Sequence, residues 1–272
     1  MLNTTVHLLL INRIGMAMKN MQVMIPEMTL LVLFSLILLM LVPLQANAAA
    51  FKVNPLKLSF SPDTKTTSLE VSNTSGGTLT LQVDVKRWSQ DSIGRDMLDD
   101  TNEILFFPKI VTLKVDEKRV IRVNYRGEKV NAKEKTFRIF VQELVDRSRD
   151  KNALNFALRF SIPIFVTPRN ASARVRISHV ETSGDKVSLV VENSGGTYSL
   201  IKKIQLTGLD DRQREVFFRE EKGWYVLAGS SNVFEMSLAK SECQKASTME
   251  FAARSVLKTY VTRLKKNDIH CP

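Results

Sequence analysis

From Phe51 onward, the apolar residues of this chain alternate with polar ones and do not recur at helical spacing. The clearest series are Leu56, Leu58 and Phe60, and Leu79, Leu81, Val83 and Val85. Turn-forming clusters such as Ser183-Gly184-Asp185 separate these segments. Because successive side chains of a strand point to opposite faces, the pattern predicts many short strands, each with one buried face. Turns at intervals of about eight to twelve residues favour an antiparallel β-sandwich.

The chain also resembles itself. Residues 68–81 align with residues 188–200, and in each copy a strand ending in asparagine, Asn73 or Asn193, runs into a glycine-rich turn and a second strand. This repeat predicts two domains of one architecture, whereas the alternative is chance similarity between β-rich segments. We place the boundary at Thr167-Pro168, because a proline cannot donate to a ladder. The expected domains are residues 49–167 and 168–272.

The segment before the first expected domain has the pattern of an export signal. Residues 30–42 form a thirteen-residue apolar run, and Ala46-Asn47-Ala48 follows it. A membrane-spanning helix needs about 20 apolar residues, whereas a secretory signal needs roughly 7 to 15 and ends in small residues. We interpret residues 1–48 as a signal peptide that is cleaved after Ala48 or shortly beyond it, with no stable membrane insertion afterwards. A retained membrane anchor is the alternative.

The two cysteines of the chain, Cys243 and Cys271, both lie after this segment. An even number of cysteines in an oxidising compartment favours a disulfide. Two free thiols are the alternative.

The composition excludes several classes of function. The chain has only 3 His and 2 Cys, which leaves little with which to build a zinc site, and it lacks the G-x-S-x-G, H-E-x-x-H and P-loop patterns. We therefore expect neither an enzyme nor a bound metal or cofactor. The net charge of +11 comes from lysines and arginines scattered along the chain, which we attribute to solubility and partner encounter and not to nucleic-acid binding.

One predicted strand, Asn152 to Val166, is unusual in its length and apolar character. Pro163 within it indicates an edge strand or the end of a strand near a domain junction. The segment is either ordinary sandwich core or an edge offered to a partner strand. Its large apolar side chains on one face are Leu154, Phe156, Leu158, Phe160, Ile162, Ile164 and Val166.

Two cations interrupt predicted strands, Lys57 between Leu56 and Leu58, and Arg138 between Phe137 and Ile139. Such cations are usually solvated on an outward face. If both converged in a cleft, however, they would hold a carboxylate by charge-assisted hydrogen bonds.

Several segments together resemble the PapD-like periplasmic chaperones of chaperone–usher pilus assembly, and the likeness covers essentially the whole chain after the signal. The segments that carry it are residues 54–60, 108–116, 121–123, 137–144 and 154–166. The resemblance implies two immunoglobulin-like β-sandwich domains arranged in an L. It also implies a chaperone in the periplasm of a Gram-negative bacterium that binds pilus subunits by donor-strand complementation and delivers them to an outer-membrane usher. The resemblance does not fix how the free protein protects its donor strand, and a dimer in which two copies cap each other is one option.

The resemblance also implies roles for single residues. Lys57 stands where the family has an arginine that binds the subunit's terminal carboxylate. The family's second carboxylate anchor falls on Pro163, so we expect Arg138 to supply it, with Arg159 as the alternative. The donor-strand positions are taken by Leu154, Phe156, Leu158 and Phe160.

Three further positions depart from the usual pattern. Thr167 replaces the arginine before the junction proline, so Arg169 is a candidate for the interdomain contact. Val115-Asp116 replaces the usual Pro-Gly, which questions the tight turn there. The segment Ser161-Ile162-Pro163 resembles the corresponding segment in the archaic branch of these chaperones.

A structural role is the competing interpretation, in which the chain is an exported pilus subunit or adhesin. A subunit has a single sandwich that lacks its final strand, whereas this chain has two complete-looking copies. The chaperone interpretation therefore fits the repeat better.

Overall fold

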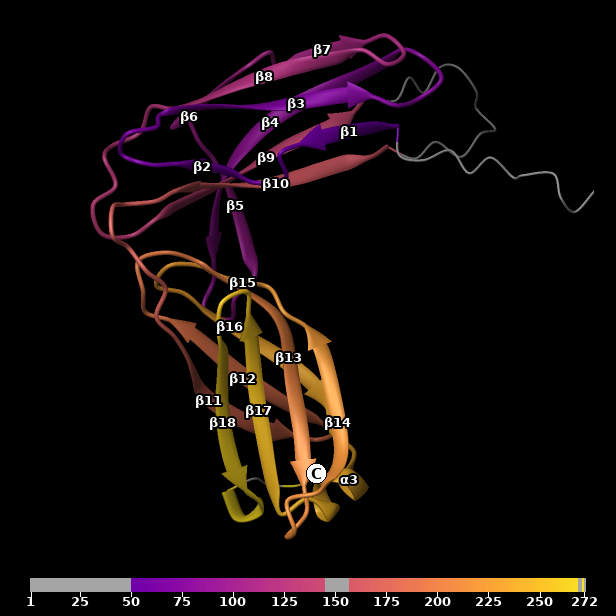
Figure 1. Ribbon diagram of the computed structural model, residues 1–272, viewed down its shortest axis with the longest axis vertical. Helices are drawn as coiled ribbons and strands as arrows, with labels where there is room; N and C mark the ends of the chain where they lie inside the picture. The colour runs from indigo at the N-terminus through magenta and orange to yellow at the C-terminus, as the bar shows by residue number, and fades with distance from the viewer. Residues whose placement is uncertain (1–49, 145–156, 269–270, 272) are drawn as a thin grey trace, which may run out of the picture. The chain divides into compact units, whose positions relative to one another are not determined.

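The structure, a computed structural model, describes residues 50–144, 157–268 and Cys271 (Figure 1). These residues are almost entirely β-structure, as the alternation predicts. The strands up to residue 166 are β1 (Phe51–Asn54), β2 (Leu58–Phe60), β3 (Thr66–Asn73), β4 (Leu79–Gln90), β5 (Asp96–Asp100), β6 (Ile104–Phe107), β7 (Ile110–Leu113), β8 (Lys118–Tyr125), β9 (Lys135–Glu143) and β10 (Arg159–Val166). The later elements are β11 (Val175–Ser183), β12 (Lys186–Asn193), β13 (Ser199–Leu209), β14 (Glu215–Lys222), β15 (Tyr225–Val226), β16 (Ser231–Ser237), the helix α3 (Lys240–Lys245), β17 (Thr248–Ser255), β18 (Thr259–Lys265) and the 3-10 turn η1 (Lys266–Asp268).

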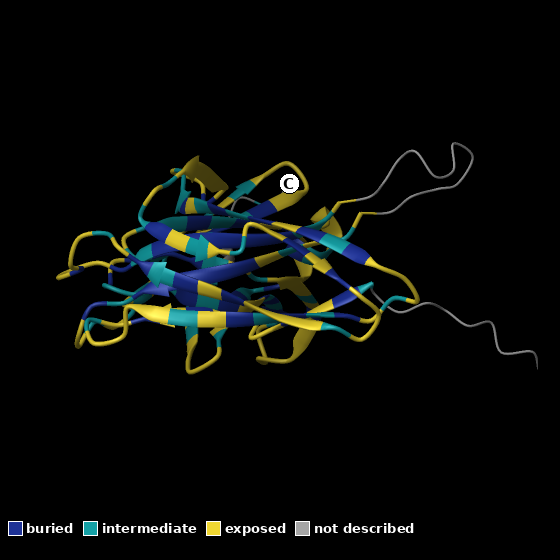
Figure 2. Cartoon of the chain, turned by 90° about the horizontal axis from the view of Figure 1, so that it is seen from above, coloured by how far each residue is buried: buried dark blue, intermediate teal, exposed yellow. Residues whose placement is uncertain are grey.

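The N-terminal set of strands forms one sandwich. One sheet has the order β1-β3-β8-β6, and the other has the order β2-β10-β9-β4-β5, with β7 also paired to β4. Side chains such as Leu81, Ile121 and Ile139 are fully buried between the two sheets. Figure 2 shows how buried and exposed positions alternate along the strands.

The C-terminal set forms a second sandwich with its own core. Its sheets have the orders β11-β12-β16 and β14-β13-β17-β18, and β15 pairs with β13. The core draws on both sheets and includes Leu189, Leu206 and Phe251. Cys243 in α3 is buried and forms a disulfide with Cys271, which confirms the predicted pairing.

The first of the repeated asparagine turns is held by the side chain of Asn73. Its amide donates to the carbonyl oxygens of Gly77, Leu113 and Lys114 at 2.7, 3.2 and 3.0 Å. One bond closes the turn that follows β3, and the other two reach the end of β7. Asn73 therefore joins its own turn to another strand of the sandwich.

Asn193 has the same geometry in the second sandwich. Its amide donates to the carbonyl oxygens of Thr197, Val226 and Leu227 at 2.7, 3.1 and 3.2 Å. The bonds again close a local turn and reach the end of a short strand, here β15. This shared structural role explains why the asparagine recurs in the repeat.

Of the long apolar strand predicted at Asn152 to Val166, the structure describes residues 157–166, and within these β10 begins at Arg159. Its inner face behaves as predicted at the C-terminal end, where alternate residues from Ile162 onward are buried. The outer face differs, because Phe165 is also buried. It packs with Trp88 and Leu227 in a small cluster that is separate from the cores of the two sandwiches. The end of β10 is thus covered on both faces.

The turn at Val115-Asp116 stays tight without the Pro-Gly pair. Asp116 adopts a positive φ of 59°, a region that aspartate tolerates better than most residues. The backbone N–H of Glu117 donates to the carbonyl of Lys114 at 3.1 Å and closes the turn.

The predicted signal peptide, and with it the cleavage site, lies outside the described residues, and so do Leu154 and Phe156. Within residues 50–144, 157–268 and Cys271, no helix is long and apolar enough to cross a membrane.

Candidate functional site

The strand β10 has one edge that is only partly paired. On one side it pairs with β9 along its whole length. On the other side it pairs in parallel with β2, but only over Ile164–Val166. Among the described residues, the stretch Arg159–Pro163 has no strand on that second side.

Two hydrogen bonds show which peptide groups of β10 face each side. The carbonyl of Leu158 accepts from the N–H of Glu143, toward β9. The N–H of Thr167 donates to the carbonyl of Phe60, toward β2. Even-numbered residues of this segment therefore direct their peptide groups to β9, and odd-numbered residues direct theirs to the other side.

This alternation defines the open edge. The N–H and C=O groups of Arg159 and Ser161 point to the side that carries no strand in the described structure. Pro163 follows in the same phase and has no N–H, so the capacity to add a further strand ends there.

The apolar side chains beside the open edge are half-buried. Leu158 and Phe160 pack against the core of the N-terminal sandwich. The ring of Phe160 meets that of Phe51 edge-on, with 5.1 Å between centroids. These side chains therefore lie between the protein's own core and the open edge.

Lys57 lies where the open edge stops. It immediately precedes Leu58, which lies opposite Ile164, so the same register brings Lys57 alongside Pro163. Leu58 is buried and Lys57 is exposed, as the alternation predicts. Leu56, predicted to share the buried face, is instead 64% exposed, because it precedes the start of β2.

Arg138 lies on the other side of Pro163. The two residues are opposite each other in the β9–β10 ladder, so Lys57, Pro163 and Arg138 form a row across the sheet. With strands about 4.8 Å apart, the backbones of Lys57 and Arg138 are separated by about 10 Å. The structure therefore brings both predicted cations to neighbouring places in one sheet.

Arg138 is not a solvated cation, however, because its side chain is only 8% exposed. Its guanidinium lies 3.8 Å from the centre of the Trp88 ring and 5.4 Å from that of Trp224. It donates to Ser161 at 3.2 Å and pairs with Asp96 at 3.4 Å. Burial lowers the pKa of Arg138 below its usual value, and the nearby Asp96 carboxylate opposes that shift.

This cluster leaves part of the guanidinium unsatisfied. The Nε atom of Arg138 is buried and has no hydrogen-bond partner among the described residues. A buried donor without a partner is costly, so an additional acceptor would be stabilising there.

The two other arginines considered from the sequence lie elsewhere. Arg159, at the start of β10, stacks over the ring of Phe140 at 4.0 Å and precedes Pro163 by about 13 Å of strand. Arg169 forms an ion pair with Asp63, which belongs to the turn after β2. Arg169 thus contacts the N-terminal sandwich through this pair.

Sequence reasoning missed an acidic residue beside Arg138. Asp96 on β5 accepts from the indole N–H of Trp224 at 3.2 Å as well as pairing with Arg138. The local sequence does not indicate a role for Asp96, because its partners Arg138 and Trp224 are far away in the chain.

It also missed a buried carboxylate near Lys57. Glu134 accepts from the Thr167 hydroxyl at 2.7 Å and from the Tyr198 N–H at 3.1 Å, and it interacts electrostatically with Lys57. Glu134 lies between Lys133 and Lys135, so its immediate sequence gives no sign that it is buried.

Comparison with known proteins places these features in a family. Residues 50–172 match the N-terminal domain of PapD, described as a pili and flagellar-assembly chaperone. No curated protein sequence matches the chain.

Solved structures share the fold over both sandwiches. One is the complex of CsuC with the tip adhesion subunit CsuE from archaic chaperone–usher Csu pili of Acinetobacter baumannii, with 21% identity, a TM-score of 0.57, and coverage of 79% of this chain and 98% of that one. The YadV chaperone has 15% identity and a TM-score of 0.54, with coverage of 80% and 100%. The Salmonella enterica complex of the pilin SafA with the chaperone SafB has 14% identity and a TM-score of 0.52, with coverage of 80% and 97%.

These likenesses confirm the two-sandwich fold. Pilus-assembly chaperones are a non-enzymatic class and work in the periplasm, which agrees with the expectation that the chain is not an enzyme. The match of residues 50–172, together with the fold of both sandwiches, supports a PapD-like pilus-assembly chaperone.

Proposed function

We propose that this protein is a periplasmic chaperone that binds pilus subunits by donor-strand complementation and delivers them to an outer-membrane usher. The observation that carries the proposal is the open edge of β10 at Arg159–Pro163, which ends beside an exposed lysine. An unpaired strand edge is a template for another strand.

The donor strand would consist of β10 and the residues before it. Leu158 and Phe160 supply the part that the structure describes, and Leu154 and Phe156 continue the same phase outside it. Full burial of four such side chains contributes roughly 6 to 12 kcal/mol before the costs of ordering and association. Those costs reduce the net affinity, which suits a complex that must later be dissolved.

The carboxylate at the end of the subunit would bind at Lys57. A subunit strand that runs parallel to β10 reaches the row of Pro163 with its C-terminal end, where the ladder stops. We propose that the Lys57 ammonium binds that carboxylate and that Arg138 is the second anchor through its unsatisfied donor. Arg159 lies too far back along β10 to share this role.

The solved complexes support the proposal by likeness. CsuC forms a complex with the tip subunit CsuE, and SafB forms one with the pilin SafA. The fold shared with this chain makes pilus subunits the expected partners.

Lys57→Glu tests the carboxylate site. We expect it to abolish co-purification with pilus subunits from periplasmic extracts, because it replaces the attractive charge with a repulsive one. Lys52→Glu is the matched control, since Lys52 is exposed on β1 and lies in the other sheet. Both variants should stay folded, although Lys57→Glu also replaces an attractive partner of Glu134 with a repulsive one and should lower the melting temperature slightly. Wild-type recovery of subunits by Lys57→Glu would contradict the assigned role.

Phe156→Asp tests the donor strand separately, through the half-life of subunits in the periplasm. We expect a shorter half-life, because a charged side chain would enter the subunit's apolar groove. Phe218→Asp, an exposed position in the C-terminal sandwich, is the control. Delivery is tested by capture of the chaperone–subunit complex on the purified usher, which should fail for free chaperone.

A further inference from the structure

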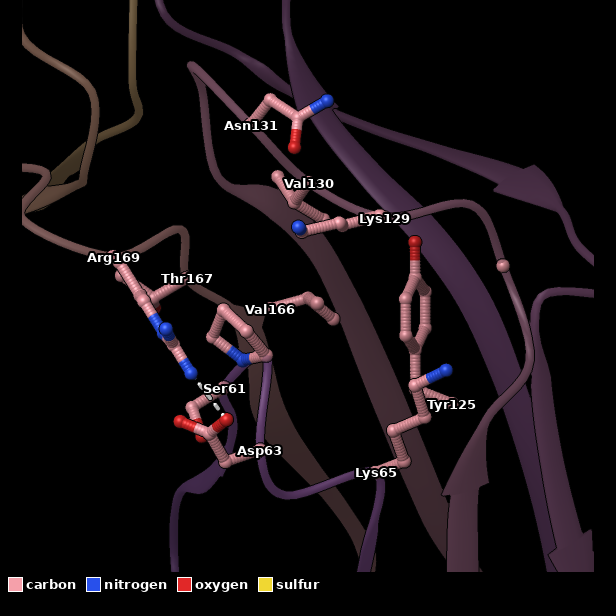
Figure 3. Close-up of a pocket in the computed structure, with 12 residues that line it drawn as sticks. Ser61, Asp63, Lys65, Tyr125, Lys129, Val130, Asn131, Val166, Thr167 and Arg169 are labelled. Atoms are coloured by element: carbon pink, nitrogen blue, oxygen red, sulfur yellow. Dashed lines mark hydrogen bonds and ion pairs between the residues drawn. The ribbon is translucent and has the colours of Figure 1, made fainter.

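A hollow of about 490 Å³ lies at one end of the N-terminal sandwich, away from the open edge of β10 (Figure 3). Three segments line it: residues 61–65 after β2, residues 125–131 from the end of β8 onward, and residues 166–169 from the end of β10 onward. Its volume is in the range of small-molecule sites. Of the β10 residues, only Val166 lines it, so it is separate from the proposed subunit site.

Backbone hydrogen bonds fix the walls of this hollow. Ser61 and Thr64 exchange two bonds, at 3.2 and 3.1 Å, and the N–H of Tyr125 donates to the carbonyl of Lys65 at 2.9 Å. The Tyr125 hydroxyl donates to the carbonyl of Glu128 at 2.6 Å. A ligand would therefore meet walls that are already ordered, which lowers the cost of binding.

The charges around the hollow are mainly positive. Lys65, Lys129 and Arg169 line it, and the single acidic residue among its lining residues is Asp63, which already pairs with Arg169. Lys65 and Lys129 form no ion pair with any residue that the structure describes, unlike strand lysines such as Lys86. Figure 3 shows the Lys129 side chain extending across the opening.

The base of the hollow is apolar. Tyr125, Val130 and Val166 are 5%, 9% and 4% exposed and contribute a ring and two branched side chains. Ser61 and Asn131 add a hydroxyl and an amide to the lining. Such a lining suits an organic body that carries negative charge better than a bare inorganic ion.

We propose that this hollow is a binding site for a small organic dicarboxylate, whose apolar body packs on Tyr125, Val130 and Val166 and whose carboxylates pair with Lys65 and Lys129. Both lysines line the hollow without an acidic partner among the described residues, so a dicarboxylate would gain a charge-assisted hydrogen bond at each. This proposal does not depend on subunit binding.

The test titrates the mature protein with benzene-1,3-dicarboxylate as the probe. Binding is measured from the amide chemical shifts at constant ionic strength. We expect saturable binding with the largest shifts in residues 61–65, 125–131 and 166–169. Lys129→Ala should weaken the affinity at least about tenfold, the loss expected for one charge-assisted contact. The exposed Lys52→Ala serves as the matched control and should bind as the wild type does.

The neutral benzene-1,3-dicarboxamide separates charge from shape, and we expect it not to bind. Absence of saturable binding of the dicarboxylate would overturn the proposal. Equal binding of the diamide, or affinity unchanged by Lys129→Ala, would overturn it as well.

Discussion

The last strands of the two sandwiches differ although the sandwiches share a repeat. β18 ends the C-terminal sandwich with alternating exposed positions, and its Arg263 pairs with Glu250 on β17. β10 instead places half-buried Leu158 and Phe160 beside an open edge and is covered on both faces at its other end. Charged side chains protect a strand edge from unwanted pairing, whereas apolar ones invite it. The same architecture can therefore have a protected edge in one copy and an available edge in the other.

The strongest test of the shared part is the asparagine turn. Asn193→Ala and Asn73→Ala should each lower the free energy of unfolding by about 3 to 5 kcal/mol, because each removes several buried hydrogen bonds and leaves backbone groups unpaired. Denaturant unfolding of each variant measures the loss. A cost below about 1 kcal/mol at either site would show that the repeated turn is not a common structural element.

The second test concerns the disulfide, which belongs to the C-terminal sandwich and not to the N-terminal one. Reduction of Cys243–Cys271 should destabilise the C-terminal sandwich by about 3 to 4 kcal/mol, because the link closes a long loop in the unfolded chain. Calorimetry with and without reductant measures the effect, and the double variant Cys243→Ala/Cys271→Ala checks that the reductant has no other target. An equal shift in the transition of the N-terminal sandwich would contradict this assignment.

A matched pair of substitutions compares the last strands directly. Ile162→Ala on β10 should cost about 2 to 4 kcal/mol, because Ile162 is 2% exposed. Val261→Ala on β18 should change stability by less than about 0.5 kcal/mol, since Val261 is 51% exposed. Similar costs for the two variants in denaturant unfolding would remove the contrast between the strands.

The smallest expected effect concerns pH. Burial raises the pKa of Glu134 above its ordinary value of 4.5, while its bonds to Thr167 and Tyr198 oppose the shift. The folded state therefore binds the proton more tightly than the unfolded state, so this group makes stability fall as pH rises from about 4.5 through the raised pKa. Glu134→Gln should remove that part of the slope in unfolding experiments across this range, and an unchanged slope would contradict the assignment.

Much of the fold could be predicted from local patterns. Alternation identified buried Leu58 and Phe60, and the repeat identified Asn73 and Asn193 as equivalent turns. Periodicity and turn residues are local properties, so they can be recognised without knowing which strands become neighbours.

The site could be predicted only in part. Lys57 was recognised because it interrupts an apolar series. The surroundings of Arg138 were not, since Asp96, Trp88 and Trp224 come from three other segments.

The sequence by itself indicated the β-sandwich class and the repeated turn, and it limited any disulfide within the chain to Cys243 and Cys271, because each depends on spacing or on a count along the chain. Only the tertiary structure decided where the edge of β10 is open, that Lys57 and Arg138 lie in one row, and that Arg138 is buried against Trp88. These features depend on strand order and on packing between distant segments, which local periodicity does not encode.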